Sequence, residues 1–293
     1  MFFAVFIFIL ILLIVVFLVV GVIPSNCTSD YSSPLNFVMF QEPKNRYSDQ
    51  LVNLWVDKPW RSDGKRIPAR IEYAYTSNTP TSERKLIIYS HGNAEDLLHC
   101  VQFTQELTKN FLMDVVCWDY SGYGLNDLDK FERTPEGINL SLQTLLDHMV
   151  QQKGYDISNI ILWGYSLGSG PTVHTAAKLC DNNTCPAGVI LFGAYSSILD
   201  VVKDVTHEKV AQMFSERWNN REMINHITCP VLLMHGQNDG LIGYHHAETL
   251  KSAKPDAKLV GLPNTGHTRF SWSEAIKEVR KWLREEKLHV SLE

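Results

Sequence analysis

A serine stands at the centre of a Gly-x-Ser-x-Gly pentapeptide, residues 164–168, directly after the apolar run 160–163. A strand that turns sharply into a helix needs small residues two positions before and after the turn, so that the strained backbone can present the serine oxygen. The pentapeptide therefore predicts a strand, a tight turn and a helix, with Ser166 as a nucleophile. The same pattern also arises by chance as a turn with an incidental serine, so the prediction depends on partners elsewhere in the chain.

A serine hydroxyl is a weak nucleophile that needs a base, and the base needs an acid to orient it. Downstream of Ser166, Asp239 follows the apolar run 231–234 and His267 follows the run 258–262. We expect His267 to act as general base and then as acid, and Asp239 to fix the imidazole tautomer. Asp200 is an alternative acid, but the start of a helix explains it equally well.

The tetrahedral intermediate of acyl transfer needs two donors for its oxyanion, usually backbone N–H groups. One predicted donor is the amide of Leu167, which follows the nucleophile. The other is the amide of Asn93, in the loop after the apolar run 85–90. The cycle built from these groups uses no metal ion and no organic cofactor, and the remaining histidines form no metal pattern with the cysteines.

Short apolar runs alternate with helical patterns along the chain, which indicates a mostly parallel sheet covered by helices on both faces. Early strands are predicted at 36–41 and 67–76, the second alternating apolar and polar residues. Thr134 and Pro135 mark the start of a long helix that ends near Gln152. The six later strands are expected at 85–90, 113–118, 159–163, 188–192, 231–234 and 258–262, and the other helices at 95–110 and from near Leu167, Leu241 and Trp272.

The 34 residues 195–228 lie between the apolar run 188–192 and the run 231–234 that precedes Asp239. A serine hydrolase built on such a sheet often carries a cap over its active site at this point. So short a cap would leave the serine open and would suit an acyl group on a bulky carrier. Its apolar side chains could line an acyl channel, but packing of the cap onto the core is the favoured interpretation for most of them. These side chains are Ile198, Leu199, Val201, Val202, Met213, Phe214 and Trp218.

The chain of 293 residues carries 27 Lys and Arg against 32 Asp and Glu, a net charge of −5 that argues against nucleic-acid binding. Residues 1–23 contain no charged side chain. As a helix, residues 2–23 would be about 33 Å long, enough to cross the hydrocarbon core of a bilayer. We therefore predict a single-pass membrane anchor at 1–23, a linker at 24–33 and one catalytic domain at 34–293. Because no Lys or Arg stands before Lys44, the sequence does not show which side of the membrane the catalytic domain faces.

Six cysteines are too few for a disulfide scaffold. Cys180 and Cys185 flank a polar loop that a small disulfide could close. Glycosylation sequons stand at Asn26, Asn139 and Asn182, and the sequence does not decide whether any of them is used.

Four motifs stand at the ends of predicted strands: His-Gly-Asn-Ala-Glu-Asp at 91–96, Asp-Tyr-Ser-Gly-Tyr-Gly at 119–124, the pentapeptide at 164–168, and His235-Gly236 with Asp239. Together they resemble the α/β-hydrolase-domain proteins related to the family 17 depalmitoylases, over about residues 34–283. The resemblance implies an α/β-hydrolase fold and a serine hydrolase. Members of this kind remove palmitate from cysteine thioesters on membrane-associated proteins, and neighbouring branches cleave lysophospholipids and monoacylglycerols. Where those depalmitoylases carry a lipidated cysteine-rich N-terminus, this chain has a hydrophobic segment.

The leading functional hypothesis is a membrane-anchored hydrolase of long-chain acyl esters or thioesters, whose partners are an acylated protein or a lipid and the bilayer itself. A lysophospholipid or monoacylglycerol lipase is the first alternative. A serine peptidase or a catalytically silent scaffold is the second, because fold alone does not decide function.

Overall fold

The computed structural model describes residues 67–74, 79–93, 95–124, 134–206, 211, 216–268 and 271–289. The predicted anchor at 1–23, the linker at 24–33 and the strand expected at 36–41 lie outside these residues. Among the helices of the described part, none has the length and apolar character needed to cross a membrane.

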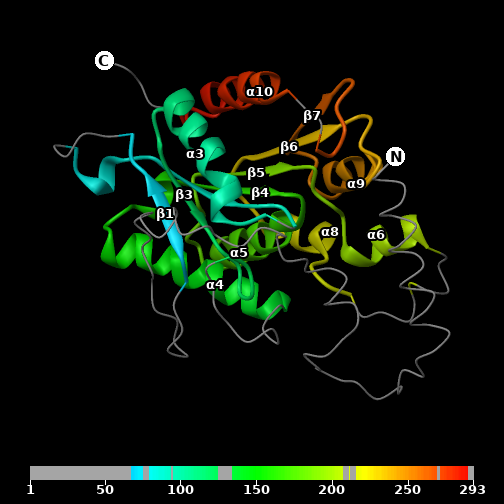
Figure 1. Cartoon of the computed structure of the whole chain (residues 1–293), viewed down its shortest axis with the longest axis horizontal. Coiled ribbons are helices and arrows are strands. Elements are labelled where there is room, and N and C mark those ends of the chain that lie inside the picture. The colour runs from blue at the N-terminus through cyan, green and yellow to red at the C-terminus, as the bar shows by residue number, and fades with distance from the viewer. Residues whose placement is uncertain are drawn as a thin grey trace.

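Seven strands form one sheet in the order β1-β3-β2-β4-β5-β6-β7. All neighbouring strands are parallel except β1, which pairs antiparallel with β3 at one edge. The predicted mostly parallel sheet is therefore confirmed (Figure 1). The strands are β1 (Ala69–Glu72), β2 (Leu86–Ser90), β3 (Asp114–Trp118), β4 (Ile160–Tyr165), β5 (Gly188–Phe192), β6 (Val231–Gly236) and β7 (Lys258–Leu262).

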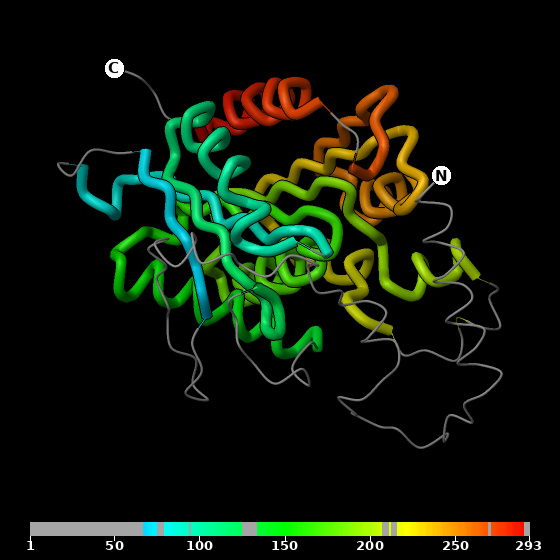
Figure 2. The backbone as a smooth tube through the Cα atoms, in the orientation of Figure 1, coloured from blue at the N-terminus to red at the C-terminus, as the bar shows by residue number. Residues whose placement is uncertain are grey.

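The order of the strands reverses at β2, which has β3 on one side and β4 on the other. In an open parallel sheet, a crevice forms outside the carboxyl ends of the strands at such a reversal. The chain path in Figure 2 shows β1 in blue at one edge of the sheet and β7 in orange towards the other. The carboxyl ends of β2, β4, β5, β6 and β7 therefore face the same side of the molecule.

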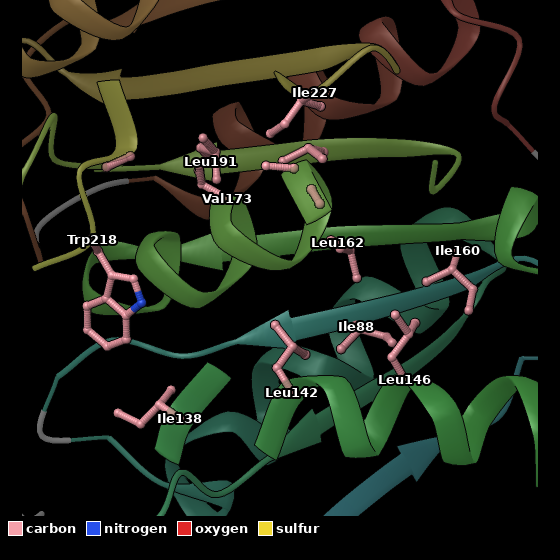
Figure 3. Packing of buried hydrophobic residues seen from close by; sticks show 14 of the residues in the cluster. Ile88, Ile138, Leu142, Leu146, Ile160, Leu162, Val173, Leu191, Trp218 and Ile227 are labelled. Atoms are coloured by element: carbon pink, nitrogen blue, oxygen red, sulfur yellow. The ribbon is translucent and has the colours of Figure 1, made fainter. Parts of the chain in front are cut away.

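The central strands are buried throughout because helices cover both faces of the sheet. Alternate residues of β2 show this: Ile88 joins the core under α4 and α5, and Ile87 joins the core under α3 and α10. Figure 3 shows Ile88 close to Leu142 and Leu146 of α4. These helices are α3 (Leu97–Phe111), α4 (Pro135–Asp147), α5 (Ser169–Asp181) and α10 (Trp272–Glu285).

Two predicted helix starts have different outcomes. Thr134 caps α4, since its Oγ1 accepts a hydrogen bond from the Gly137 amide at 3.1 Å, and Pro135 occupies the first turn as predicted. The helix expected from near Leu241 instead begins at His245 as α9 (His245–Ala253). The reason is that the amides of Leu241 and Ile242 donate to the Asp239 carboxylate, which holds this segment as a loop.

The segment between β5 and β6 contains the helices α6 (Ile198–Val205) and α8 (Asn220–Met223). At the end of α5, Cys180 and Cys185 form the disulfide that the sequence left open. Of the described cysteines, Cys100, Cys117 and Cys229 are free and buried.

Candidate active site

The turn after β4 places Ser166 at the carboxyl edge of the sheet. The strand runs to Tyr165, two residues further than expected, because its parallel pairing with β5 continues to that residue. Ser166 has φ of +51°, a left-handed conformation that non-glycine residues rarely adopt and that marks functional strain. The short 3₁₀ helix η6 (Ser166–Gly168) then leads into α5.

Glycines on both sides make this turn possible. A Cβ on Gly164 would lie 2.6 Å from the Gly168 carbonyl oxygen, and a Cβ on Gly168 would lie 2.1 Å from the Ser90 carbonyl oxygen. Such distances are far below van der Waals contact, so a larger residue would force the backbone apart. The second contact also shows that the end of β2 packs directly against the turn.

The loops after β6 and β7 bring Asp239 and His267 to the same edge. His267 Nε2 lies 2.9 Å from Ser166 Oγ, and His267 Nδ1 lies 2.7 Å from Asp239 Oδ2. Because a carboxylate only accepts hydrogen bonds, Nδ1 carries the proton and Nε2 faces the serine hydroxyl as an acceptor. His267 thus lies within hydrogen-bond distance of both Ser166 and Asp239, the two other residues predicted from strand ends.

The environment of Asp239 favours its charged form. Burial alone would raise the pKa of this carboxyl, but hydrogen bonds from His235 and His267 outweigh burial and hold the pKa well below its ordinary value. Its other oxygen accepts from the amides of Leu241 and Ile242, both at 2.9 Å. An ionised Asp239 is the form that orients and stabilises a charged imidazole.

Two residues that support this site were not assigned to it from the sequence. The Tyr165 hydroxyl donates to the His267 backbone oxygen at 2.8 Å, and the two rings stack with centroids 5.6 Å apart. His235 is fully buried, with Nε2 3.5 Å from Asp239 Oδ2 and 2.8 Å from the Ile242 oxygen. Their positions beside Ser166 and at the end of β6 were the available signals, but only the fold shows what they contact.

The loop after β2 carries the second predicted oxyanion donor. The amide of Gly92 donates to Glu95 Oε2 at 2.7 Å, and the side chain of Asn93 accepts from the Tyr123 hydroxyl at 2.7 Å. These bonds, together with the packing of Ser90 on Gly168, hold Asn93 in the loop that adjoins the turn containing Leu167. The two backbone amides remain the proposed oxyanion donors.

The chain is similar in sequence to known hydrolases. The alpha/beta hydrolase L404 of Acanthamoeba polyphaga mimivirus is 32% identical over 222 residues, which are 75% of this chain and 80% of that protein. The chain belongs to the α/β-hydrolase family. No protein-family profile matches it.

Two further relatives of this α/β hydrolase are longer proteins. The lysophosphatidylserine lipase ABHD12 of Danio rerio is 25% identical, and the match covers 76% of this chain and 60% of the lipase. The alpha/beta hydrolase domain-containing protein 17C of Homo sapiens is 26% identical, with 70% of this chain and 60% of that protein covered. The chain thus spans about three fifths of these relatives, and the expected resemblance to the family 17 proteins is confirmed.

Solved structures agree with this fold. An esterase from Thermogutta terrifontis superposes with a TM-score of 0.60 at 20% identity, covering 80% of this chain and all 100% of the esterase. A puromycin-hydrolyzing peptidase of Mycobacterium tuberculosis gives a TM-score of 0.63 at 14% identity, covering 82% of this chain and 39% of the peptidase. At these identities the likeness shows the fold alone.

The alternative acid, Asp200, lies elsewhere in this α/β hydrolase. It sits in α6, where its carboxylate accepts from Ser196 Oγ at 2.7 Å and faces Arg221 at 3.7 Å. Asp239, by contrast, is the carboxylate that contacts His267. The geometry therefore favours Asp239 over Asp200 as the acid.

Most of the described apolar side chains of the cap pack onto the core, as the favoured interpretation predicts. Ile198 and Trp218 are buried in the core, and Val201 and Val202 pack against it. Trp218 Nε1 also donates to Asn139 Oδ1 of α4 at 2.9 Å. Leu199 is half-buried, and Met213 and Phe214 lie outside the described residues.

His91, after β2, serves packing. Its ring is fully buried and stacks on Tyr120 with centroids 3.9 Å apart. Burial lowers its pKa to about 4, so the ring is neutral at physiological pH.

Proposed function

We propose that this α/β hydrolase is a serine hydrolase that cleaves long-chain acyl esters or thioesters through an acyl-enzyme intermediate. The observation that carries the proposal is the arrangement of Ser166, His267 and Asp239 around a serine held at φ of +51°, with contacts of 2.9 and 2.7 Å. A neutral imidazole that faces a serine hydroxyl and is oriented by a buried carboxylate is the arrangement that activates the serine.

In the proposed cycle, Ser166 Oγ attacks the acyl carbonyl while its proton passes to His267 Nε2. Asp239 keeps its hydrogen bond to Nδ1 and stabilises the imidazolium. The amides of Leu167 and Asn93 donate to the oxyanion. Collapse of the intermediate expels the alcohol or thiol, which takes the proton from His267, and water then releases the acid by the same steps in reverse.

The choice of an acyl substrate is supported by the relatives. One relative is named a lysophosphatidylserine lipase, another belongs to the family 17 proteins, and an esterase shares the fold. We propose a palmitoylated protein or a membrane lipid as the substrate. The lipase relative favours a lysophospholipid as the second candidate.

The proposal is tested by measuring how fast the purified full-length chain, in detergent, hydrolyses thioesters and oxygen esters with acyl chains from butyryl to palmitoyl. We expect turnover that rises towards long chains and is lost in Ser166→Ala. Equal, low rates for wild type and Ser166→Ala would reject the enzyme. A preference for amino-acid amides would indicate a peptidase, and a preference for lysophospholipid over palmitoyl-cysteine peptides would select the second candidate.

We also propose that residues 1–23 anchor the protein in a membrane and so bring the site to acyl chains concentrated there. A deletion of residues 1–23 should lower turnover of palmitoyl substrates embedded in vesicles and leave turnover of a soluble butyryl ester unchanged. The butyryl ester reports whether the deleted form still folds. Unchanged turnover of the vesicle substrate would contradict the anchor.

A further inference from the structure

A second cluster of titratable side chains joins α6 to α9. Asp204 Oδ2 lies 3.0 Å from His245 Nε2 and 2.9 Å from His246 Nε2. The three groups can present one ligand atom each, with all three atoms within 4.8 Å of one another. His246 is buried, but the side chains of Asp204 and His245 are 35% and 56% exposed, so the cluster is open to solvent. Figure 1 shows α6 and α9 at the same end of the molecule.

His246 is also held from its other side. Its Nδ1 lies 2.8 Å from Ser196 Oγ, and that hydroxyl lies 2.7 Å from Asp200 Oδ2. Lys203 and Arg221 face Asp200 at 3.5 and 3.7 Å, which favours an ionised carboxylate that accepts the serine proton. This side of the imidazole is therefore fixed by Ser196, which is itself held by Asp200.

His246 is thereby held on both sides. Its Nε2 meets the Asp204 carboxylate at 2.9 Å, and its Nδ1 meets both the hydroxyl of Ser196 at 2.8 Å and the backbone N–H of Ser196 at 3.2 Å. A ligating histidine is commonly fixed in this way, with one nitrogen in the site and the other anchored outside it.

We propose that Asp204, His245 and His246 bind a first-row divalent cation, with zinc as the best fit to two imidazoles and one carboxylate. Ligand atoms around a tetrahedral zinc lie about 3.3 Å apart, given bonds of roughly 2.0 Å. The contacts of 2.9 and 3.0 Å need to open by only a few tenths of an ångström. Solvent completes the coordination on the exposed side.

Around the cation, Ser196 and Asp200 complete the support that ligating histidines usually have. Ser196 Oγ lies 2.8 Å from His246 Nδ1 and donates to Asp200 Oδ2 at 2.7 Å. A carboxylate or hydroxyl on the far nitrogen fixes the tautomer that ligates. Binding releases any proton that occupied Nε2.

The expected consequence is a clamp between the cap and the core. Asp204 belongs to α6 of the cap, and both histidines belong to α9, which packs on the sheet. Ser196 lies three residues after Gly193, where an added Cβ would be 3.5 Å from the His267 ring. A bound cation would therefore stabilise the cap close to the candidate active site.

Titration calorimetry with zinc on the untagged, chelator-treated full-length chain in detergent tests the proposal. The solution contains no reductant, so that the Cys180–Cys185 disulfide stays intact and offers no thiolates. We expect one zinc per chain, a rise in Tm with zinc, and at least a tenfold loss of affinity in His245→Gln. His245 is exposed, so this variant should fold as the wild type does.

His226→Gln is the matched control, because His226 is half-exposed and pairs with a single carboxylate, Asp181, at 3.0 Å. Its zinc affinity should equal that of the wild type. The visible spectrum of bound cobalt provides a second readout, and its bands should disappear in Asp204→Asn. Absence of stoichiometric binding, or binding that survives both His245→Gln and Asp204→Asn, would overturn the proposal.

Discussion

The molecule contains two clusters of serine, histidine and aspartate, and they differ in what holds the serine. Ser166 contacts His267, which contacts Asp239, at 2.9 and 2.7 Å. Ser196 contacts His246, which contacts Asp204, at 2.8 and 2.9 Å. The same three residue types thus occur twice within hydrogen-bond distance, at almost equal spacings.

The difference lies in the backbone and in the direction of the hydrogens. Ser166 sits on a left-handed turn at the end of a strand, and Asp239 holds the Nδ1 proton so that Nε2 faces the serine. In the second cluster Nδ1 faces Ser196, whose hydroxyl is directed to Asp200. A serine whose hydroxyl is directed to a carboxylate, and away from the imidazole, is not activated by that histidine. Similar distances between the three side chains therefore do not make a serine a nucleophile. The backbone conformation that exposes the hydroxyl and the direction of its hydrogen bond decide this.

The largest difference between the two clusters should come from their serines. Ser166→Ala should lower kcat for long-chain acyl ester hydrolysis by at least about 10³-fold, because it removes the nucleophile. Ser196→Ala should stay within a few-fold of wild type. Steady-state rates of the two variants measure this, and an equal loss in both would show that the clusters are not functionally distinct.

The second largest difference in activity should come from the aspartates of the two clusters. Asp239→Asn should lower kcat by roughly 10²–10⁴-fold, because the amide no longer holds the tautomer that leaves Nε2 as a base. Asp204→Asn should lower it only a few-fold. Pre-steady-state acylation measured with a chromogenic ester reports the effect, and full activity in Asp239→Asn would remove this residue from the proposed mechanism.

The turn itself can be disrupted without replacing any polar side chain. Gly168→Ala should destabilise the fold by about 3 kcal/mol, at the upper end of what overpacking costs, since the new methyl meets the Ser90 oxygen at 2.1 Å. Gly240→Ala is the control, because nothing lies within 4 Å of a Cβ there. Urea unfolding measures both, and a Gly168→Ala protein as stable as the control would contradict the close packing.

The smallest expected effect is in the acid dependence of stability. The pKa of Asp239 is held below its ordinary value in the folded state, so its contribution is full above the unfolded value of about 3.9 and is lost as pH falls below it. Asp239→Asn should therefore lose less stability than wild type between pH 5 and pH 3. Urea unfolding at the two pH values tests this, and parallel losses would exclude the carboxyl as a source.

Much of the architecture could be predicted from local patterns. The apolar runs located β2 to β7, of which β2 to β6 are buried throughout and the edge strand β7 is partly buried. Thr134 with Pro135 located the start of α4. The rule that strand ends meet at one edge of a parallel sheet selected Ser166, Asp239 and His267. Each of these features follows either from residues close together in the chain or from a general rule for parallel sheets.

Other features depended on segments far apart in the chain. The start of α9 moved to His245 because Asp239 captures the amides that a helix from Leu241 would need. The contact of Tyr165 with the His267 backbone, across a hundred residues, has no local signature. Nor could the sequence show that His246 faces both Ser196 and Asp204, since α6 and α9 meet only in the folded chain.

Residue order and hydrophobic period thus determined the sheet, its helices and which strand ends carry reactive side chains. Tertiary structure alone decided which nitrogen of each histidine faces which oxygen, and therefore which serine has a base. The physical reason is that a hydrogen bond depends on tenths of an ångström and on direction. Local patterns set the order of elements, but only the packing of the whole domain sets those distances.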